Sequence, residues 1–398
     1  MILAKSLTKS LTGKLLCYLC IAAIALLVLN ACTTTDRRML AQAAKGRNVE
    51  QAAESFARQK KHQYQNDPTA LVRDVQNLTV LFEQLRGNAG KVWGEKNVNL
   101  PSRKKYVKYT DHYRSRALVD FDSGSITVET LNGKAPDSQL KQAIVTTLLT
   151  TDDPAETDIF TDTPPNFSGQ PYLYGQVLDQ EGKAIRYEWR AKRFAEYLIK
   201  HHQQRSETSK GTRYSVTFPM VQNHHQLRKQ KYSEYVLESS AKYQVPPALI
   251  YAIIETESSF NPFAVSPANA YGLMQVVPKT AGKDVYTRIK KRNDQPTRSV
   301  LFRPQDNIDI GTAYLHILDD IYLDDLNNHQ SREYAVISAY NGGAGNVFKT
   351  FSNNRKHAPS VINGLSSSQV YWRLTQKHPR AESRRYLEKV MQYQEKYR

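Results

Sequence analysis

Cysteine is scarce in this sequence. The 398 residues contain three, and two of them, Cys17 and Cys20, lie within an apolar N-terminal segment. That segment has the pattern of an export signal that is later removed. The chain that remains would keep Cys32 alone, which excludes an intrachain disulfide. We therefore expect its stability to come from packed cores rather than from covalent cross-links.

The sequence also lacks the patterns that mark metal and nucleic-acid sites. Two histidine pairs, at 201–202 and 224–225, have no cysteine or acidic residue at a spacing that completes a zinc site. We interpret all four histidines as surface residues and expect no metal. No nucleic-acid-binding motif, internal repeat or low-complexity block is present in the sequence.

Acidic residues are few relative to basic ones, 38 against 55, which gives a formal charge of +17. A hydrophobic fraction of 40% and a charged fraction of 23% are typical of globular domains and exclude a disordered chain. The length suits two domains of ordinary size. The positive charge favours an anionic partner, and nucleic acid, anionic lipid and an acidic polymer all fit it.

The N-terminus narrows that choice. Three lysines and no acidic residue precede an apolar run over 15–29, which is short for a membrane span and typical of a secretory signal. The run ends in Leu-Asn-Ala-Cys, which resembles the lipobox of bacterial lipoproteins. The resemblance implies a signal peptide over 1–31 and lipidation of Cys32. A plain N-terminal membrane anchor, with Cys32 as an incidental thiol, is the alternative. Loss of the three lysines lowers the formal charge to 17 − 3 = +14.

The residue after the cysteine is Thr33, where an aspartate would favour retention in the inner membrane. The resemblance therefore points to the bacterial outer membrane, with the chain facing the periplasm. An exported, lipid-anchored chain does not meet genomic nucleic acid, so no nucleic-acid partner is expected. The expected partners are the membrane, through the lipid on Cys32, and peptidoglycan glycan strands, whose stem peptides carry carboxylates.

Hydrophobic periodicity predicts both strands and helices in the first half of the chain. Strands are indicated by alternating segments at 117–131, 171–185 and 212–221. Helices are indicated by segments at 69–85, 140–149 and 189–202. The last of these helices is basic and would contact an anionic polymer if it binds one, although a solvated face is the simpler interpretation.

The strand patterns end before the second half of the chain begins. We predict an α+β fold class, with a lipid-anchored tether over 32–66 and an N-terminal mixed α+β domain over 67–225. A mostly α-helical domain follows over 226–398.

One predicted helix of the second domain, at 246–260, carries two glutamates. At about 100° per residue, Glu257 falls within roughly 40° of Ile250 and Ile253 on the apolar face. Glu255 points about 160° away from Glu257, toward a more polar side. The pattern thus predicts that Glu257 faces the core and that Glu255 need not.

A carboxylate on an apolar face is salt-bridged, lies at an exposed helix end, or acts as a catalytic acid. Burial and the negative end of the helix would both raise the pKa of Glu257. A carboxyl group that is still protonated near neutral pH can protonate a glycosidic oxygen, as the lysozyme glutamate with a pKa of about 6 does.

Motifs downstream of the helix decide among these interpretations. Glu257-Ser258 is followed in order by Gly-Leu-Met-Gln at 272–275, Ala-Tyr-Asn-Gly-Gly at 339–343 and Glu-Ser-Arg-Arg-Tyr at 382–386. Together they resemble the lysozyme-like domain of soluble-type lytic transglycosylases over about 170 residues, and several spaced motifs are far more specific than one. The lipobox and the preceding α+β domain resemble a membrane-bound type within that family.

The resemblance implies non-hydrolytic cleavage of the β-1,4 bond between N-acetylmuramic acid and N-acetylglucosamine in peptidoglycan. Glu257 is implied as the acid that protonates the linking oxygen. It then acts as the base that takes the proton from the C6 hydroxyl of muramic acid. That hydroxyl attacks C1 and leaves a 1,6-anhydromuramic acid end, and no cofactor is implied.

Seven further motif residues are implied to bind substrate: Ser266, Met274, Gln275, Tyr340, Asn341, Glu382 and Tyr386. The resemblance places Met274 and Gln275, as an apolar contact and an amide donor, along the sugars that flank the cleaved bond. Met274 and Tyr340 are otherwise packed core residues, and Asn341 is otherwise a helix stop. Glu382 is otherwise the partner of a neighbouring arginine.

Two other functions fit the same sequence. A lysozyme-type hydrolase normally needs two carboxylates across the cleaved bond, and the next acidic residue after Glu257 is Asp284, beyond the Gly-Leu-Met-Gln motif. A distant acid such as Glu382 would supply the second carboxylate if the fold brings it close. A non-catalytic cell-wall-binding lipoprotein is the other alternative, and the intact Glu257 argues against it.

Overall fold

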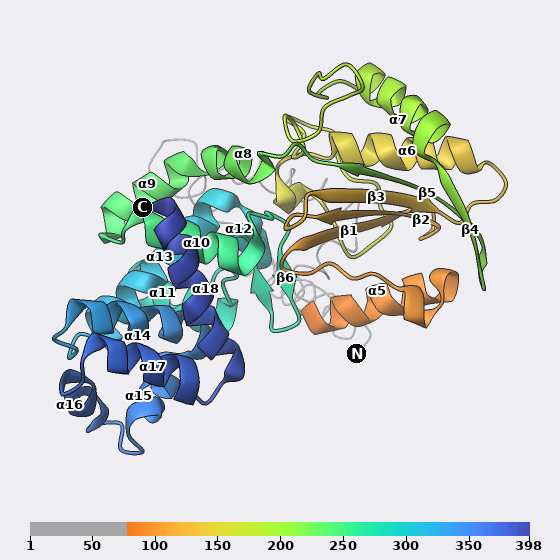
Figure 1. The fold of residues 1–398 in the computed structure, drawn as a ribbon. Helices are drawn as coiled ribbons and strands as arrows, with labels where there is room; N and C mark the ends of the chain where they lie inside the picture. The colour runs from red at the N-terminus through yellow and green to blue at the C-terminus, as the bar shows by residue number, and fades with distance from the viewer. Residues whose placement is uncertain (1–77) are drawn as a thin grey trace, which may run out of the picture. The chain divides into compact units, whose positions relative to one another are not determined.

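The computed structural model describes residues 78–398. The predicted signal peptide, the tether and Cys32 lie outside the described residues. The first part of the described chain contains a five-stranded antiparallel sheet in the order β1-β2-β3-β5-β4 (Figure 1). Its strands are β1 (Lys105–Thr110), β2 (Ser115–Asp120), β3 (Ser125–Thr130), β4 (Gln204–Thr208) and β5 (Gly211–Pro219). The accompanying helices are α5 (Leu78–Trp93), α6 (Pro136–Leu149) and α7 (Glu188–His202), with 3-10 turns at Glu95–Asn97 and Pro154–Glu156.

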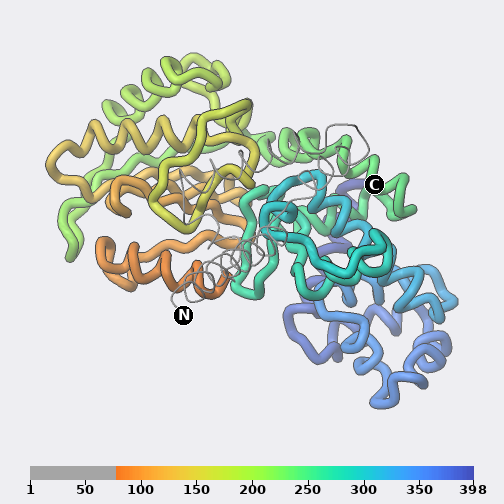
Figure 2. The backbone as a smooth tube through the Cα atoms, turned by 180° about the vertical axis from the view of Figure 1, so that it is seen from behind, coloured from red at the N-terminus to blue at the C-terminus, as the bar shows by residue number. Residues whose placement is uncertain are grey.

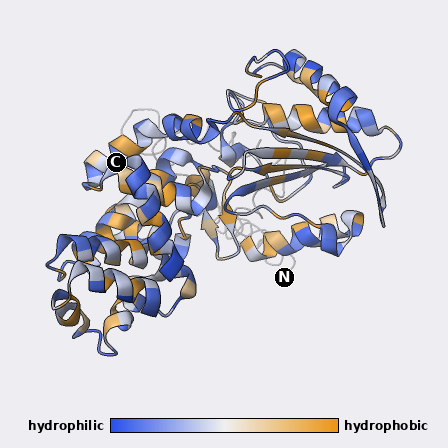
Figure 3. Cartoon of the chain, in the orientation of Figure 1, coloured by the Kyte–Doolittle hydropathy of each residue, from blue (hydrophilic) through white to orange (hydrophobic). Residues whose placement is uncertain are grey.

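Helices cover both faces of this sheet. Helices α6 and α7 lie on one face and α5 lies on the other (Figure 1), and apolar residues run along most of α6 (Figure 3). Because both faces are covered, polar side chains on the strands are buried as well and need partners. Arg116 of β2 pairs with Glu129, its cross-strand neighbour on β3, at 2.6 Å and stacks 3.7 Å from the ring of Trp93 at the end of α5.

The remainder of the described chain is mostly helical. Its helices are α8 (His224–Lys231), α9 (Ser233–Tyr243), α10 (Pro247–Ser258), α11 (Lys283–Arg288), α12 (Arg298–Phe302), α13 (Pro304–Ile317), α14 (His329–Gly342), α15 (Ala344–Phe351), α16 (Ala358–Asn363), α17 (Ser367–Lys377) and α18 (Ala381–Tyr397). Two short strands, β6 (Val265–Ser266) and β7 (Ala270–Tyr271), form a hairpin after α10, and π-helical turns lie at Pro278–Gly282 and Leu318–Tyr322. Figure 2 shows these helices from the opposite side.

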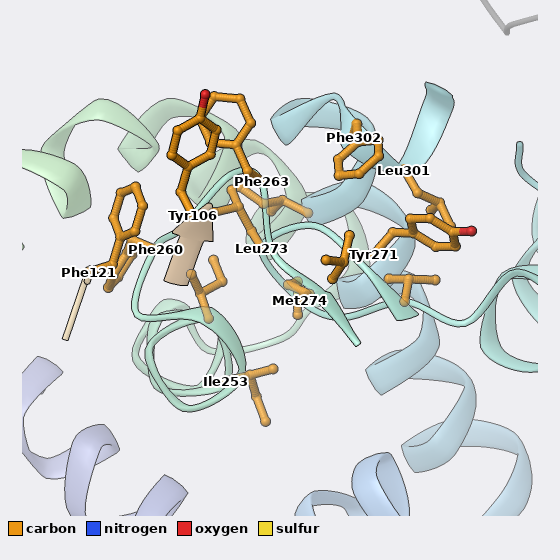
Figure 4. Packing of buried hydrophobic residues seen from close by; sticks show 14 of the residues in the cluster. Tyr106, Phe121, Ile253, Phe260, Phe263, Tyr271, Leu273, Met274, Leu301 and Phe302 are labelled. Atoms are coloured by element: carbon orange, nitrogen blue, oxygen red, sulfur yellow. The ribbon is translucent and has the colours of Figure 1, made fainter. Parts of the chain in front are cut away.

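Aromatic side chains join the sheet to the segment after α10. Tyr106 on β1 packs beside Phe263 (Figure 4), with the two ring centroids 4.7 Å apart. Tyr172 packs edge-on against the same phenylalanine at 5.1 Å. All three rings are buried, so the first half of the chain and the end of α10 share one apolar cluster. This packing fixes the segment before β1 beside the C-terminal end of α10.

The structure confirms the α+β fold class and corrects two predictions within it. The segment 171–185, predicted as a strand, contains only isolated bridges and turns, because its polar positions are used in loop hydrogen bonds such as those to Asp179. The prediction that all four paired histidines lie on the surface is wrong for His224, which is 7% exposed. Its ring fills the space above Gly124, and burial lowers its pKa to about 4, so it is a neutral core residue.

Two kinds of feature are absent from residues 78–398. No helix in this part of the chain is long and apolar enough to cross a membrane. In the same residues, no three histidine, cysteine or acidic side chains are placed to hold a metal ion.

Candidate active site

Helix α10 is buried on every side. From Leu249 to Ser258 no residue is more than 8% exposed, and α18 packs along the helix. A helix surrounded in this way has no polar face, so the wheel argument about Glu255 is wrong: at 3% exposure it is buried as deeply as Glu257. The two glutamates are distinguished by their partners rather than by their burial.

Glu255 is neutralised by the C-terminal end of α18. The Lys396 ammonium donates to both of its carboxylate oxygens, at 2.9 and 3.2 Å, and the Tyr397 hydroxyl donates to one of them. His225 lies 3.9 Å away. Two strong donors satisfy this buried carboxylate and tie α10 to α18, so Glu255 is the salt-bridged member of the pair.

The negative charge of an ionised Glu257 is compensated much less than that of Glu255. Burial is the largest influence and raises the pKa of Glu257 to about 7, while the Arg103 guanidinium, 3.4 Å from Oε2, acts in the opposite direction. The nearby hydroxyl of Tyr386 also lowers the pKa of Glu257, less than the charge of Arg103 does. Glu257 is therefore a buried acid that is partly protonated near neutral pH, with one cation placed to stabilise its ionised form.

Arg103 is a residue that the sequence did not single out. It lies just before β1, 154 positions upstream of Glu257. Its backbone carbonyl accepts a hydrogen bond of 3.1 Å from the Asn261 side chain in the turn after α10. It also contacts Glu382 at 3.4 Å. No local pattern marks such a residue, because only the packing of the sheet beside α10 brings it to the site.

The turn after α10 is locked to the Gly-Leu-Met-Gln motif. The Ser258 hydroxyl donates to the carbonyl of Leu273 at 2.8 Å. The buried amide of Asn307 on α13 accepts from the backbone N–H of Met274 at 2.7 Å and donates to the carbonyls of Tyr271 and Leu301 at 2.8 Å. Asn307 is thus the central support of the motif, and the sequence did not predict this role.

A cleft of about 600 Å³ lies over this arrangement. Its lining comes from the segment before β1, the end of α10, the β6–β7 hairpin and α18, and includes Thr256 and Tyr386. Within the described residues, the buried hydroxyls of Thr256 and Tyr386 have no hydrogen-bond partner. Buried polar atoms without partners at the wall of a cleft fit a ligand that supplies hydroxyls and amides.

The cleft lining contains three of the predicted binding residues. Ser266 lies there with Glu382 and Tyr386, which follow it by more than a hundred positions in the sequence. Gln275 is buried nearby, and its Nε2 donates to the carbonyl of Gly272 at 3.0 Å. Its Oε1 has no partner among the described residues, and the second N–H of the same amide is a further donor, so the expected role of Gln275 as an amide donor stays a prediction.

The other three predicted binding residues lie outside that lining. Met274 is fully buried with its sulfur near Thr312, and Tyr340 donates to the carbonyl of Met274 at 2.8 Å. Asn341, in the last turn of α14, accepts from the Ser383 hydroxyl of α18 at 2.7 Å. These contacts hold the motifs in place without lining the cleft. Direct contact of the three residues with substrate stays a prediction.

Replacement of Arg103 by methionine tests the electrostatics of the site. Loss of the cation is expected to raise the pKa of Glu257 further, because the guanidinium is the chief influence that lowers it. The alkaline limb of the kcat/KM profile, along which the acid loses its proton, should then move upward by up to about one pH unit. An Arg103→Lys variant, which keeps the charge, should move it less. If the alkaline limb of Arg103→Met does not move, Glu257 is not the group that loses its proton along that limb.

Comparison with known proteins accounts for nearly all of the described chain. Residues 71–231 match the family model described as the N-terminal domain of membrane-bound lytic murein transglycosylase C, and residues 234–363 match the transglycosylase SLT domain. The membrane-bound lytic murein transglycosylase C of Yersinia enterocolitica serotype O:8 is 48% identical over 335 residues, which cover 84% of this chain and 93% of that protein. The protein of the same name from Shigella sonnei is 48% identical over 330 residues, with 83% and 92% covered.

Among solved structures, the 70 kDa soluble lytic transglycosylase from Escherichia coli is 25% identical, with a TM-score of 0.33. The match covers 42% of this chain and 24% of that protein, so this chain spans about a quarter of its length. At this TM-score the likeness adds nothing to what the family models and the relatives show.

The two family models place the chain among proteins that carry a transglycosylase SLT domain. With 48% identity over more than four fifths of its length, the chain belongs to the membrane-bound lytic murein transglycosylase C family. The family resemblance of the sequence motifs is thereby confirmed.

Proposed function

We propose that the chain is a peptidoglycan lytic transglycosylase in which Glu257 alone serves first as acid and then as base. The observation that carries the proposal is the burial of this carboxyl beside a single arginine, which brings its pKa to about 7. An acid with this pKa is present in both protonation states near neutral pH, as a group that must donate and then accept a proton requires.

The proposed reaction starts with the proton on Glu257. The carboxyl gives this proton to the oxygen that links N-acetylmuramic acid to N-acetylglucosamine, and the C1–O bond breaks. The carboxylate that results is stabilised by Arg103 at 3.4 Å. It then takes the proton of the muramic acid C6 hydroxyl as that oxygen bonds to C1. Glu257 is protonated again, and water is not consumed.

A hydrolase of the lysozyme type is the second candidate, and Glu382 is the reason to keep it. Arg103 contacts both Glu382 and Glu257 at 3.4 Å, and Glu382 lines the cleft, so a second carboxylate lies near Glu257. The Glu382 side chain is 51% exposed, which leaves it available as a base for water. The geometry therefore does not decide between the C6 hydroxyl and water as the attacking group, and the products must.

Mass spectrometry of the products separates these candidates. Purified peptidoglycan is digested with the chain that lacks its first 32 residues, beside the Glu257→Gln and Glu382→Gln variants. The proposal predicts muropeptides with anhydro ends, one water lighter than hydrolysis products, from the first protein and from Glu382→Gln but not from Glu257→Gln. Reducing ends that vanish in Glu382→Gln would instead establish a hydrolase. Sedimentation with peptidoglycan but no products from any of the three would favour a binding protein.

We further propose that the enzyme is anchored in the bacterial outer membrane by a lipid on Cys32 and faces the periplasm. The relatives are named as membrane-bound, and the lipobox offers the attachment point. The domain bounds 67–225 and 226–398 belong to the same proposal, with the two family models at 71–231 and 234–363 in support. Labelling with a radioactive fatty acid, which Cys32→Ser should abolish, tests the anchor.

A further inference from the structure

Four cations line the proposed substrate cleft. Arg103 and Lys104 come from the segment before β1, and Arg385 and Lys389 come from α18. The last two are four residues apart, so they lie on the same face of their helix. A neutral glycan gives these cations nothing to pair with. Their presence therefore indicates that the substrate carries an acidic group at this position.

Within residues 78–398, carboxylates offset the charge of this group only in part, and Asp122 acts on Lys389 as well as on Lys104. Lys104 pairs with Asp122 at 2.6 Å, and Arg103 is shared between Glu257 and Glu382. Within residues 78–398, neither Arg385 nor Lys389 has a carboxylate at ion-pair distance.

Other positively charged groups also lie close to the Lys389 ammonium. Burial and then the nearby Lys104 ammonium lower the pKa of Lys389; Asp122 acts in the opposite direction, and Arg103 makes the smallest contribution, which lowers the pKa further. Like charges that the fold holds together in a partly buried cleft are unfavourable on their own. An anion that enters the cleft relieves this repulsion, so the cluster favours binding of a negatively charged group.

We propose that Lys104, Arg385 and Lys389 form a subsite for the carboxylates of the peptide stem on the sugar that is cleaved. The inference rests on the proposed function, since the stem is attached to the same muramic acid whose C1 the reaction attacks. Arg103 joins the two sites, because it contacts Glu257 and lines the cleft with the other cations. The subsite makes the enzyme selective for glycan that still carries its peptides.

The test uses three preparations of glycan strands. The first carries native stems, the second carries stems whose carboxylates have been converted to amides, and the third has been stripped of its stems by an amidase. The protein without its first 32 residues is expected to show a kcat/KM about tenfold higher on native than on amidated or stripped strands, mainly through KM. The ratio should fall toward one in Lys389→Met and in Arg385→Gln. Lys141→Met on α6, a lysine paired with Glu196 and absent from the cleft lining, is the matched control and should keep the ratio.

A second readout does not depend on cleavage. Sedimentation of the Glu257→Gln variant with each preparation should show tighter binding to native strands, and addition of Lys389→Met should remove the difference. Equal kcat/KM and equal binding on native and amidated strands would overturn the subsite. So would a loss in Lys389→Met that is the same on all three preparations, because that result indicates a structural role. If no preparation is cleaved, the proposed reaction fails, while the binding comparison still decides the subsite.

Discussion

Replacement of Glu257 by glutamine is expected to lower kcat by about 10²–10⁴-fold, because the amide can neither give nor take the proton. The side chain keeps its size, so the cleft and the contacts with Tyr386 should persist. The rate is measured from the release of muropeptides over time. Glu255→Gln is the matched control: two residues away and just as buried, it leaves the proton donor in place. A Glu257→Gln enzyme with more than a tenth of the wild-type rate would contradict the assignment.

Glu257→Gln is expected to be more stable than the wild-type protein at alkaline pH, whereas Glu255→Gln is expected to be less stable. The pKa of Glu257 is raised from 4.5 to about 7 on folding, so the wild-type protein loses stability as pH rises from about 4.5 through 7. Glu257→Gln lacks this loss and should unfold with up to about 3 kcal/mol more free energy than wild type at pH 8, and with no such gain near pH 4. Glu255→Gln should be destabilised, since Lys396 loses its charged partner. Urea unfolding at the two pH values measures both effects.

Gly272→Ala is expected to be the most damaging single substitution in the loop that supports the site, at roughly 3 kcal/mol or more. Gly272 has a φ of +74°, and an added Cβ would lie 2.4 Å from both the Asn307 amide and the carbonyl of Leu301. Asn307 is the residue that holds Met274, so the clash falls on the central support of the motif.

The control for this substitution is Gly345→Ala in α15. That glycine has a φ suited to any residue and open space where a Cβ would lie, so alanine should be neutral or stabilising by up to about 1 kcal/mol. Thermal or urea unfolding compares the two variants. Equal midpoints would show that the Gly272 turn is not constrained in the way that the structure indicates.

The sequence predicted the burial of Glu257 correctly but not the burial of Glu255. The wheel argument assumes a helix with one apolar and one polar face, and α10 has neither because it is buried all round. A carboxylate placed anywhere on such a helix is buried, so position on the wheel cannot separate a structural acid from a catalytic one. The ion pair with Lys396 does separate them, and it depends on a contact across 141 positions of the chain.

Other parts of the site were hidden from the sequence for the same physical reason. Arg103 and Asn307 act through contacts made by tertiary packing, and neither belongs to a motif. The strands β2, β3 and β5 followed from alternation, which is a local property, whereas the buried His224 was missed because its cavity is made by Gly124, a hundred residues upstream. Local periodicity thus predicted elements, and motif order predicted the family, while the electrostatic partners of the acid required the fold.

The central claim is that one buried carboxyl transfers the proton and that the C6 hydroxyl, not water, attacks C1. Digestion of peptidoglycan in water enriched in oxygen-18 tests it most directly. The proposed reaction predicts anhydro-ended muropeptides with no oxygen-18 at the new end, formed by wild type and absent from Glu257→Gln. Muropeptides that gain the mass of water with one oxygen-18 at C1 would contradict it, since only hydrolysis places a solvent oxygen there.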